Sequence, residues 1–238
     1  MHQVCLTISH TNESWLISRD DLLAQVKALG GVHASFIKHS RLYLNFAVPK
    51  TQKLELNKAL KEYLCELYLT KVKKEFMKKN MRIHLDIFDV LLSILVGFDR
   101  ESEIDLLDRL IIIHDNMSID GYFYFRLQEL RGMWMDICTL AKDNALFLTD
   151  RDTMYELLRF LMSTIKPKIE RIMVKYIDSH FMVYTLDENF ITKIDNAEEL
   201  LTFFIETAPI EIRIIGDILP TKQKLILDNI FDDKLAKA

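Results

Sequence analysis

The spacing of hydrophobic residues changes twice along the chain, and the first region, residues 1 to 50, mixes strand and helix patterns. Ser18 and Asp21 have the spacing of a capping box at the start of a helix, and Gly30-Gly31 is a typical helix stop. The polar segment Lys38-His39-Ser40 fits a hairpin turn. The pattern predicts strands over Gln3 to Ile8, Val32 to Ile37 and Leu42 to Val48, and a helix over Arg19 to Leu29.

The second region, residues 51 to 166, has the period of amphipathic helices. Apolar residues recur three or four positions apart, so each helix is expected to bury one face. About five helices are predicted. They cover a segment from Pro49 to about Asn80, then His84 to Val96, Glu101 to Ile113, Ser118 or Asp120 to about Phe147, and Thr149 to Lys166.

After Pro167 the period shortens to that of strands. Asp178-Ser179-His180 can turn the chain, and Asn196 with Glu199 has the spacing of a helix cap. The pattern predicts a ββαβα unit that needs one small sheet covered by two helices. Its elements are Ile172 to Tyr176, Phe181 to Leu186, Asn196 to Glu206, Ile210 to Ile215 and Thr221 to Phe231.

The predicted fold class is therefore α+β, with a helix-rich middle between two smaller mixed segments. We expect an N-terminal α/β segment at 1–50, a helical region at 51–166 and the ββαβα unit at 167–238, or one continuous domain. The chain of 238 residues is long enough for one large domain or two small ones.

Composition indicates a globular protein of the cytoplasm. The three cysteines, Cys5, Cys65 and Cys138, are far apart and odd in number, which argues against a disulfide framework or a zinc site. No basic and apolar leader begins the chain, and the longest apolar run, Val90 to Phe98, is too short to span a bilayer. We therefore expect no membrane insertion.

A basic run from Lys71 to Arg82 is the strongest charged feature, although the formal net charge is only −4. One hypothesis is a patch that contacts nucleic-acid phosphates. The favoured alternatives are a solvated helix end and contact with the acidic helices later in the chain. The cations are Lys71, Lys73, Lys74, Lys78, Lys79 and Arg82, interrupted by Glu75.

Two arginines on the later helices are further binding candidates. Arg126 and Arg159, with Arg131, lie near tyrosines in the sequence and could together hold an acidic partner or nucleic acid. Helix-face packing with exposed charged ends is the commoner role of such residues. The candidate binding residues are thus Lys71, Lys73, Lys74, Lys78, Arg126 and Arg159.

Several common chemistries lack their motifs. The chain has no glycine-rich phosphate loop, no nucleophile elbow and no HExxH zinc motif, so we expect no cofactor, no metal and no catalytic residue. Ser163 and Lys166 match SxxK without its companion motifs. The pairs Asp86/Asp89 and Asp105/Asp108 have the spacing of a shared helix face, where a solvated polar surface is the favoured interpretation.

Four segments of the second half resemble, in order, those of the YtxC-like family of sporulation proteins. They are Ile119-Asp120-Gly121-Tyr122-Phe123-Tyr124-Phe125-Arg126-Leu127, Tyr155 to Leu161, Pro167 to Val174 and Thr207 to Gly216. Met173 and Ile215 stand where the family pattern has histidines. The resemblance, mainly over 119–231, implies a sporulation-associated protein and no particular mechanism.

The leading hypothesis is a non-enzymatic protein that acts by contacts with an unidentified protein partner, with self-association left open. The first alternative is a nucleic-acid-binding protein that uses Lys71 to Arg82. The second is an unrecognised enzyme, which would need a polar pocket with His84, His114 or His180 beside a carboxylate.

Overall fold

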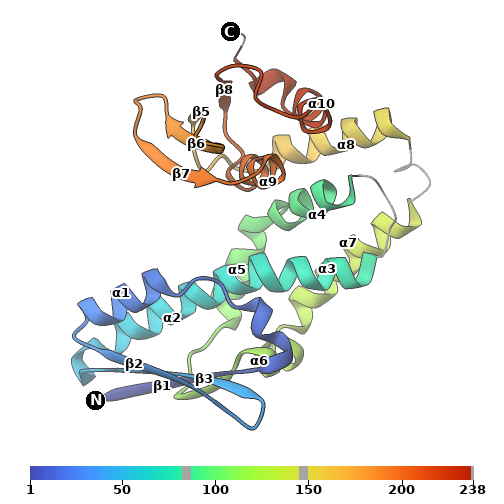
Figure 1. Cartoon of the computed structure of the whole chain (residues 1–238). Coiled ribbons are helices and arrows are strands. Elements are labelled where there is room, and N and C mark those ends of the chain that lie inside the picture. Colours follow the sequence, from blue (N-terminus) through green and yellow to red (C-terminus); the bar gives the residue numbers. More distant parts are fainter. Residues whose placement is uncertain (82–86, 145–149, 237–238) are drawn as a thin grey trace. The chain divides into compact units, whose positions relative to one another are not determined.

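The computed structural model describes residues 1–81, 87–144 and 150–236, and it confirms the α+β class (Figure 1). The chain divides into two compact units. Unit 1 combines Met1–Arg82 with Arg100–Ala141, and unit 2 combines Ile83–Asp99 with Lys142–Ala238. This division differs from the three consecutive regions expected from the sequence, because the helical middle contributes to both units.

Unit 1 contains a four-stranded sheet in the order β2-β3-β1-β4. Its strands are β1 (His2–Ser9), β2 (Val32–Lys38), β3 (Arg41–Val48) and β4 (Asn116–Ser118). Strand β1 pairs antiparallel with β3 and parallel with β4, and within the described residues β2 pairs with β3 alone. The predicted hairpin is confirmed, with His39 and Ser40 both at positive φ in a two-residue turn.

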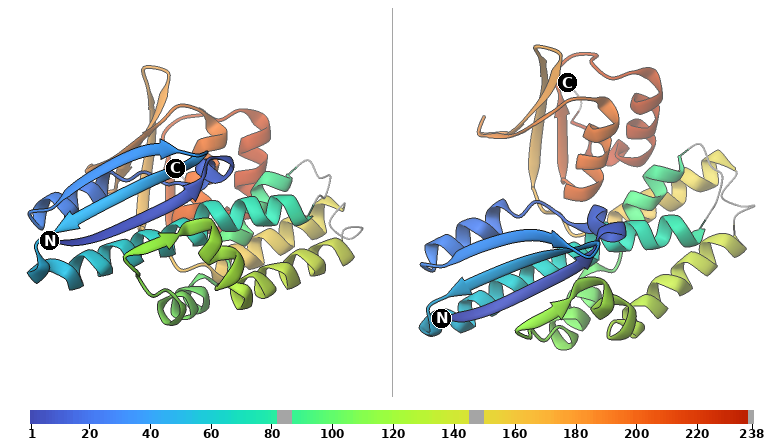
Figure 2. Two further views of the ribbon diagram at one scale, coloured as in Figure 1. Left: turned by 90° about the horizontal axis from the view of Figure 1, so that it is seen from below. Right: turned by 60° about the horizontal axis from the view of Figure 1, so that its bottom comes forward.

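Helices cover one face of this sheet (Figure 2). Alternate residues of β1 and β3 point to that face, where Leu6, Leu44 and Phe46 are buried. The helical elements of unit 1 are η1 (His10–Trp15), α1 (Asp20–Ala28), η2 (Lys50–Gln52), α2 (Lys53–Leu67), the π-helical turn η3 (Tyr68–Val72), α3 (Lys73–Met81), α5 (Arg100–Leu110), α6 (Ile119–Phe125) and most of α7 (Gln128–Asp143).

The helical segment predicted after Pro49 is confirmed, and η3 is a π-helical turn within it. Two other local expectations for unit 1 are wrong. The helix expected from Ser118 onward is two helices, since the chain leaves helical hydrogen bonding between α6 and α7. The Ser18/Asp21 capping box does not form: Arg19 is the N-cap of α1, and the Ser18 hydroxyl donates to Asp20 instead, at 2.8 Å.

Unit 2 contains a second four-stranded sheet, in the order β7-β6-β5-β8. Its strands are β5 (Arg171–Ile177), β6 (His180–Thr185), β7 (Phe190–Ile194) and β8 (Glu211–Ile214). Strand β7 was not predicted and makes the unit βββαβα. Its helical elements are α4 (Phe88–Gly97), α8 (Arg151–Thr164), α9 (Ala197–Thr207), α10 (Thr221–Ile230) and η5 (Asp232–Lys234).

The core of unit 2 joins distant parts of the sequence. Helix α4 packs on α8 and α9, and α10 packs on the same two helices. The predicted cap at Asn196 is confirmed, because its side chain accepts from the Glu199 N–H at 2.9 Å.

The predicted helix ends at His84, Phe147 and Thr149 lie outside the described residues. No helix in the described part of the chain is long and apolar enough to cross a membrane.

Candidate functional site

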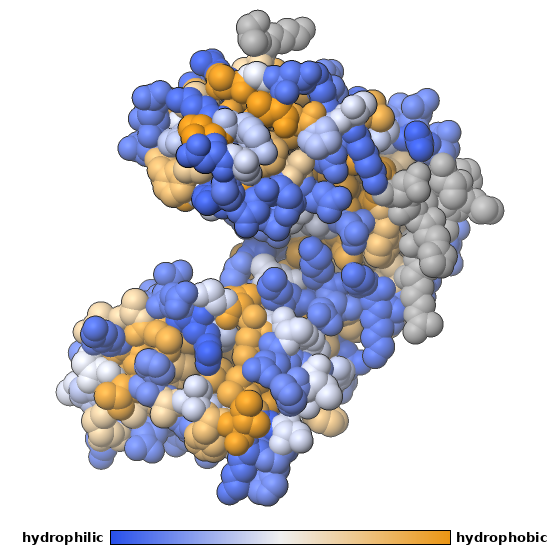
Figure 3. Space-filling view, viewed as in Figure 1, coloured by the Kyte–Doolittle hydropathy of each residue, from blue (hydrophilic) through white to orange (hydrophobic). Residues whose placement is uncertain are grey.

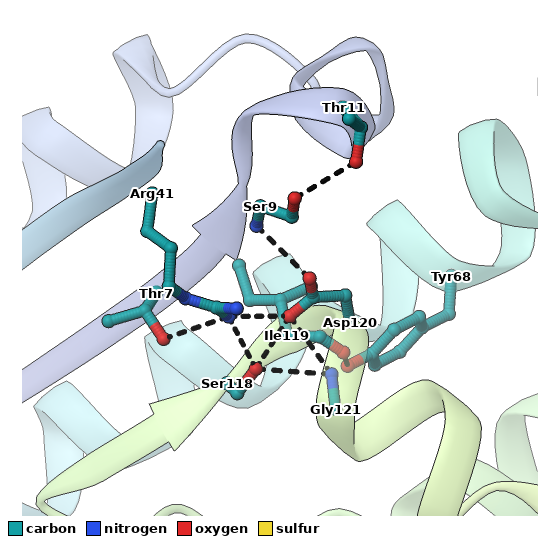
Figure 4. Close-up of polar contacts among 9 residues, drawn as sticks. All are labelled: Thr7, Ser9, Thr11, Arg41, Tyr68, Ser118, Ile119, Asp120 and Gly121. Carbon is teal, nitrogen blue, oxygen red and sulfur yellow. Dashed lines mark hydrogen bonds and ion pairs between the residues drawn. The ribbon is translucent and has the colours of Figure 1, made fainter. Parts of the chain in front are cut away.

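A polar cluster around Asp120 joins three strands of unit 1 to helix α6 (Figure 4). One carboxylate oxygen of Asp120 accepts from Arg41 Nη2 at 2.8 Å, from Ser118 Oγ at 2.5 Å and from the Gly121 N–H at 3.0 Å. The other accepts from the Ser9 N–H at 3.1 Å. Asp120 therefore lies at the point where β1, β3 and the β4–α6 junction meet.

The surroundings of Asp120 suit a structural carboxylate rather than a catalytic one. Burial alone would raise its pKa, but the hydrogen bonds from Ser118, Ser9 and Arg41 outweigh that effect, so the pKa is lowered. A general acid or base needs the opposite shift and a route to a substrate. Gly121 fits the same junction, because a Cβ there would lie 2.9 Å from Ser118 Oγ, the N-cap group of α6.

A second buried group in unit 1 contains a full ion pair. Lys73 Nζ lies 2.7 Å from Glu103 Oε1, and their side chains are 0% and 1% exposed. The same oxygen accepts from Trp134 Nε1 at 2.7 Å. This arrangement links α3, α5 and α7 and removes Lys73 from the set of cations that could contact a phosphate.

The structure describes the other lysines of the basic run, and most of them are exposed. Lys71, Lys78 and Lys79 are exposed, and Lys74 is half-buried. Arg82 lies outside the described residues. A nucleic-acid interface here would thus lack Lys73, one of the residues that motivated it.

The candidate arginines have separate surroundings. Arg159 is in unit 2, where its guanidinium donates to the Asn229 carbonyl at 2.9 and 3.1 Å and so stabilises the C-terminal end of α10. Arg126 is exposed in unit 1. The arginine that contacts an aromatic ring is Arg131, which lies 5.4 Å from the centre of Tyr124.

The sequence features considered for catalysis do not form a constellation in the described residues. His114 is exposed, and His180 lies 3.4 Å from Asp195 at the exposed end of a hairpin. Ser163 Oγ donates to the Phe160 carbonyl at 2.7 Å. Among the residues that are described, no group of three or more metal-binding side chains occurs. His84 and Asp86 are not among those residues.

The Asp105/Asp108 pair confirms the interpretation favoured from the sequence. Both aspartates are exposed on α5, and Asp108 Oδ1 forms an ion pair with Lys61 at 2.7 Å. Asp89, on α4, is exposed as well. These carboxylates therefore belong to solvated helix faces.

The most unusual surface of unit 1 is the face of its sheet that the helices leave open (Figure 2). The outward residues of the three long strands are half-buried or exposed, and none of those between the two ends of the sheet is charged. Lys38 and Arg41 stand at the hairpin end, and Asp115 lies at the opposite end. The outward residues are Gln3, Cys5 and Thr7, then Val32, Ala34 and Phe36, and Tyr43, Asn45 and Ala47.

This open sheet face, meaning those nine outward residues, has a defined shape. The rings of Phe36 and Tyr43 stack, with their centres 4.9 Å apart. Beside them lies a shallow hollow of about 860 Å³, whose lining includes Cys5, Asn45 and Asn116. Burial raises the pKa of the Cys5 thiol, so this side chain is neutral as well.

Strand β2 forms a free edge of the same sheet, since no strand among the described residues pairs with its outer side. All seven of its residues are exposed, and Val32, Phe36 and Ile37 keep 62%, 49% and 61% of their surface accessible. In the space-filling view, hydrophobic side chains reach the surface of unit 1 near β2 and β3 (Figure 3). Val32 and Phe36 belong to the open sheet face, beside Tyr43, whereas Ile37 points to the other side of the sheet.

Sequence reasoning missed the open sheet face. The signal was present, since Val32 to Ile37 lacks the alternation that a strand with one buried face requires, whereas Leu42 to Val48 alternates. Which face the helices would cover could not be read from one sequence. Comparisons with protein-family models, with curated proteins and with solved structures found no match.

Proposed function

We propose that the protein is a non-enzymatic interaction module that binds a protein partner on the open sheet face of unit 1. The observation that carries the proposal is a sheet face that is free of charge between its two ends and presents a stacked aromatic pair. The centres of protein–protein interfaces are depleted of charge and enriched in aromatic side chains. A partner with a neutral, partly apolar surface fits this face.

The same surface argues against nucleic acid as the ligand. Binding to a phosphate backbone depends on clustered cations, and this face has them only at its hairpin end. There Arg41 is already engaged by Asp120 at 2.8 Å. The basic run offers Lys71, Lys78 and Lys79 on another part of unit 1, without Lys73.

The resemblance to YtxC-like proteins supplies a cellular setting for the proposal. The partner would then be a protein of sporulating cells, met in the cytoplasm. Of the resembling segments, Ile119 to Leu127 includes the Asp120 junction that holds β1, β3 and β4 together, so it supports the sheet rather than the binding surface.

The proposal is tested by placing one charge in the middle of the open sheet face. Asn45 lies between Cys5 of β1 and Ala34 of β2, so Asn45→Lys puts an ammonium group at the centre of the surface. Tagged full-length protein would be used to capture partners from sporulating cells, with and without nuclease. We expect Asn45→Lys to lower the yield of a nuclease-resistant partner about tenfold, since burying an unpaired charge opposes association.

The matched control is Thr139→Lys, which makes the same change of charge on an exposed position of α7. It should capture the partner as the wild type does, and both variants should have the thermal unfolding midpoint of the wild type. The proposal is wrong if Asn45→Lys retains the partner, or if only nucleic acid is captured and nuclease removes it.

A further inference from the structure

Apart from Lys38 at its end, β2 has none of the sequence features that usually protect edge strands. Natural edges are kept from pairing by charged side chains such as lysine, by proline, by bulges or by short length. Strand β2 has seven residues with regular pairing to β3, no proline and, before its last residue Lys38, no lysine, arginine or carboxylate. By contrast, edge strand β7 carries Lys193, and its pairing with β6 is irregular between Val183 and Tyr184.

The hairpin turn fixes which backbone groups of β2 face outward. In a two-residue hairpin the residues flanking the turn, here Lys38 and Arg41, exchange both hydrogen bonds, and such pairs then alternate along the ladder. Phe36, Ala34 and Val32 therefore bond to β3. The N–H and C=O groups of the other three residues, His33, Ser35 and Ile37, point away from the sheet.

These outward groups are symmetric about Ser35, the middle residue of β2. A second β2 running antiparallel across a two-fold axis would place Ser35 opposite Ser35 and His33 opposite Ile37. All of the outward groups would then be paired, with about six hydrogen bonds across the junction.

The side chains are compatible with this self-pairing. Phe36 would face Ala34, a large residue against a small one, and Lys38 would face Val32. Within β2, Lys38 is the one side chain with a permanent charge, and in this register it is far from its own copy. No like charges oppose each other, a condition that cross-strand pairs require.

We propose that β2 pairs with β2 of a second copy of this chain, so that two unit 1 sheets join into one continuous sheet. The two-fold axis of an antiparallel pair is perpendicular to the sheet, so both open sheet faces would lie on the same side. A partner would then meet two adjoining copies of that face. The inference rests on the strand edge and does not depend on the proposed function.

A cysteine scan tests the register. Under mild oxidation Ser35→Cys should form a disulfide-linked dimer, because opposed residues of an antiparallel pair lie about 4.5–5.5 Å apart, within reach of a disulfide. Lys38→Cys is the matched control on the same strand, and its copies would be on the order of 20 Å apart.

Peptide mapping distinguishes a bond between two introduced cysteines from one that involves native Cys5, Cys65 or Cys138. Equal cross-linking of the Ser35→Cys and Lys38→Cys variants overturns the proposal. So does a Ser35→Cys variant whose introduced thiols do not link to each other.

A second variant tests the backbone bonds. The Ser35 N–H points out of the sheet, so Ser35→Pro removes a donor that the unit does not use internally, whereas Ser35→Val keeps it. Sedimentation equilibrium over a concentration series should show the wild type and Ser35→Val as dimers, and Ser35→Pro with at least tenfold weaker association. A wild type that stays monomeric, or a dimer unaffected by Ser35→Pro, overturns the proposal. Either result leaves the Asn45→Lys test of the open sheet face intact.

Discussion

Asp120 and Glu103 are both buried in unit 1, but they satisfy their charges differently. Asp120 is surrounded by donors from strand ends and a helix start, including the Ser9 and Gly121 N–H groups. Glu103 instead accepts hydrogen bonds from Lys73 Nζ and Trp134 Nε1 in the helical core. A buried ion pair contributes little net stability over an apolar pair of the same volume, yet breaking it is costly. We propose that the Lys73–Glu103 ion pair, with Trp134, fixes how α3, α5 and α7 pack against one another.

We therefore expect Glu103→Gln to destabilise unit 1 by about 3–5 kcal/mol, because it removes the carboxylate that faces buried Lys73. The double variant Lys73→Met/Glu103→Gln should recover most of that loss, since the introduced amide oxygen still accepts from Trp134. The measurement is the free energy of unfolding in urea. Glu129→Gln, at an exposed position of α7, is the control and should change little. A double variant as unstable as the single one would contradict this assignment.

Among the secondary-structure elements, the π-helical turn η3 explains why Lys73 is buried. The helical spacing of Leu60, Leu64 and Leu67 continues to Lys71 and Lys74, which would then be the inward positions. The π-helical turn η3 inserts extra residues into the helix and rotates the next turns about the helix axis. Val72 and Lys73 become the inward residues, and Lys71 is exposed. A single irregular turn thus converts a candidate phosphate contact into a core residue.

Two glycines, Gly31 and Gly132, allow a matched test of how closely the backbone is packed around β2. Gly31 connects α1 to β2, and a Cβ there would lie 2.7 Å from the Ala47 carbonyl oxygen. Gly132, in α7, has open space around it. We expect Gly31→Ala to destabilise the protein by about 1–3 kcal/mol. Gly132→Ala should stabilise it by about 0.5–1 kcal/mol, because alanine favours a helix interior.

Thermal and urea unfolding of the two variants measure this difference, since the chemical change is the same in both. If Gly31→Ala were as stable as the wild type, the backbone around β2 would have to shift easily. That result would also weaken the description of β2 as a fixed edge.

At the scale of the whole molecule, neither unit is a continuous stretch of chain. Unit 2 takes α4 from the middle of the sequence, and α4 packs on α8 and α9. Leu91, Leu92 and Ile94 of α4 are buried. A fragment that starts after unit 1 would lose this helix and expose the apolar surfaces that α4 covers.

We expect the fragment 142–238 to unfold without a cooperative transition and to bind a hydrophobic dye, whereas the full chain unfolds cooperatively. Each Å² of buried apolar surface stabilises a fold by about 25 cal/mol. Loss of the buried face of α4 therefore removes a large part of the free energy of unfolding of a small unit. Circular dichroism and dye fluorescence measure both properties. A fragment with a sharp transition at the full-length midpoint would show that α4 is dispensable.

The sequence by itself determined the α+β class, the β2–β3 and β5–β6 hairpins, the cap at Asn196 and most helix positions. These follow from period, turn residues and caps, which act over a few neighbouring residues. Strand β4 was missed, because Asn116–Ser118 is too short to show a period and is defined by pairing with β1. The contact of Lys73 with a later acidic helix was a favoured alternative and is confirmed by its ion pair with Glu103 of α5. The full burial of Lys73 was missed, since it depends on η3 and on Glu103 thirty residues away.

Only the tertiary structure decided which surface is available for binding. Residues of β1 and β3 alternate in the sequence, but alternation does not say which face the helices cover or that β2 lies at an edge. Those features come from contacts between distant segments, such as β1 with β4 and α4 with α9. The open sheet face and the free edge of β2 therefore exist only in the folded chain, where the helices cover one face of the sheet and the strands have paired.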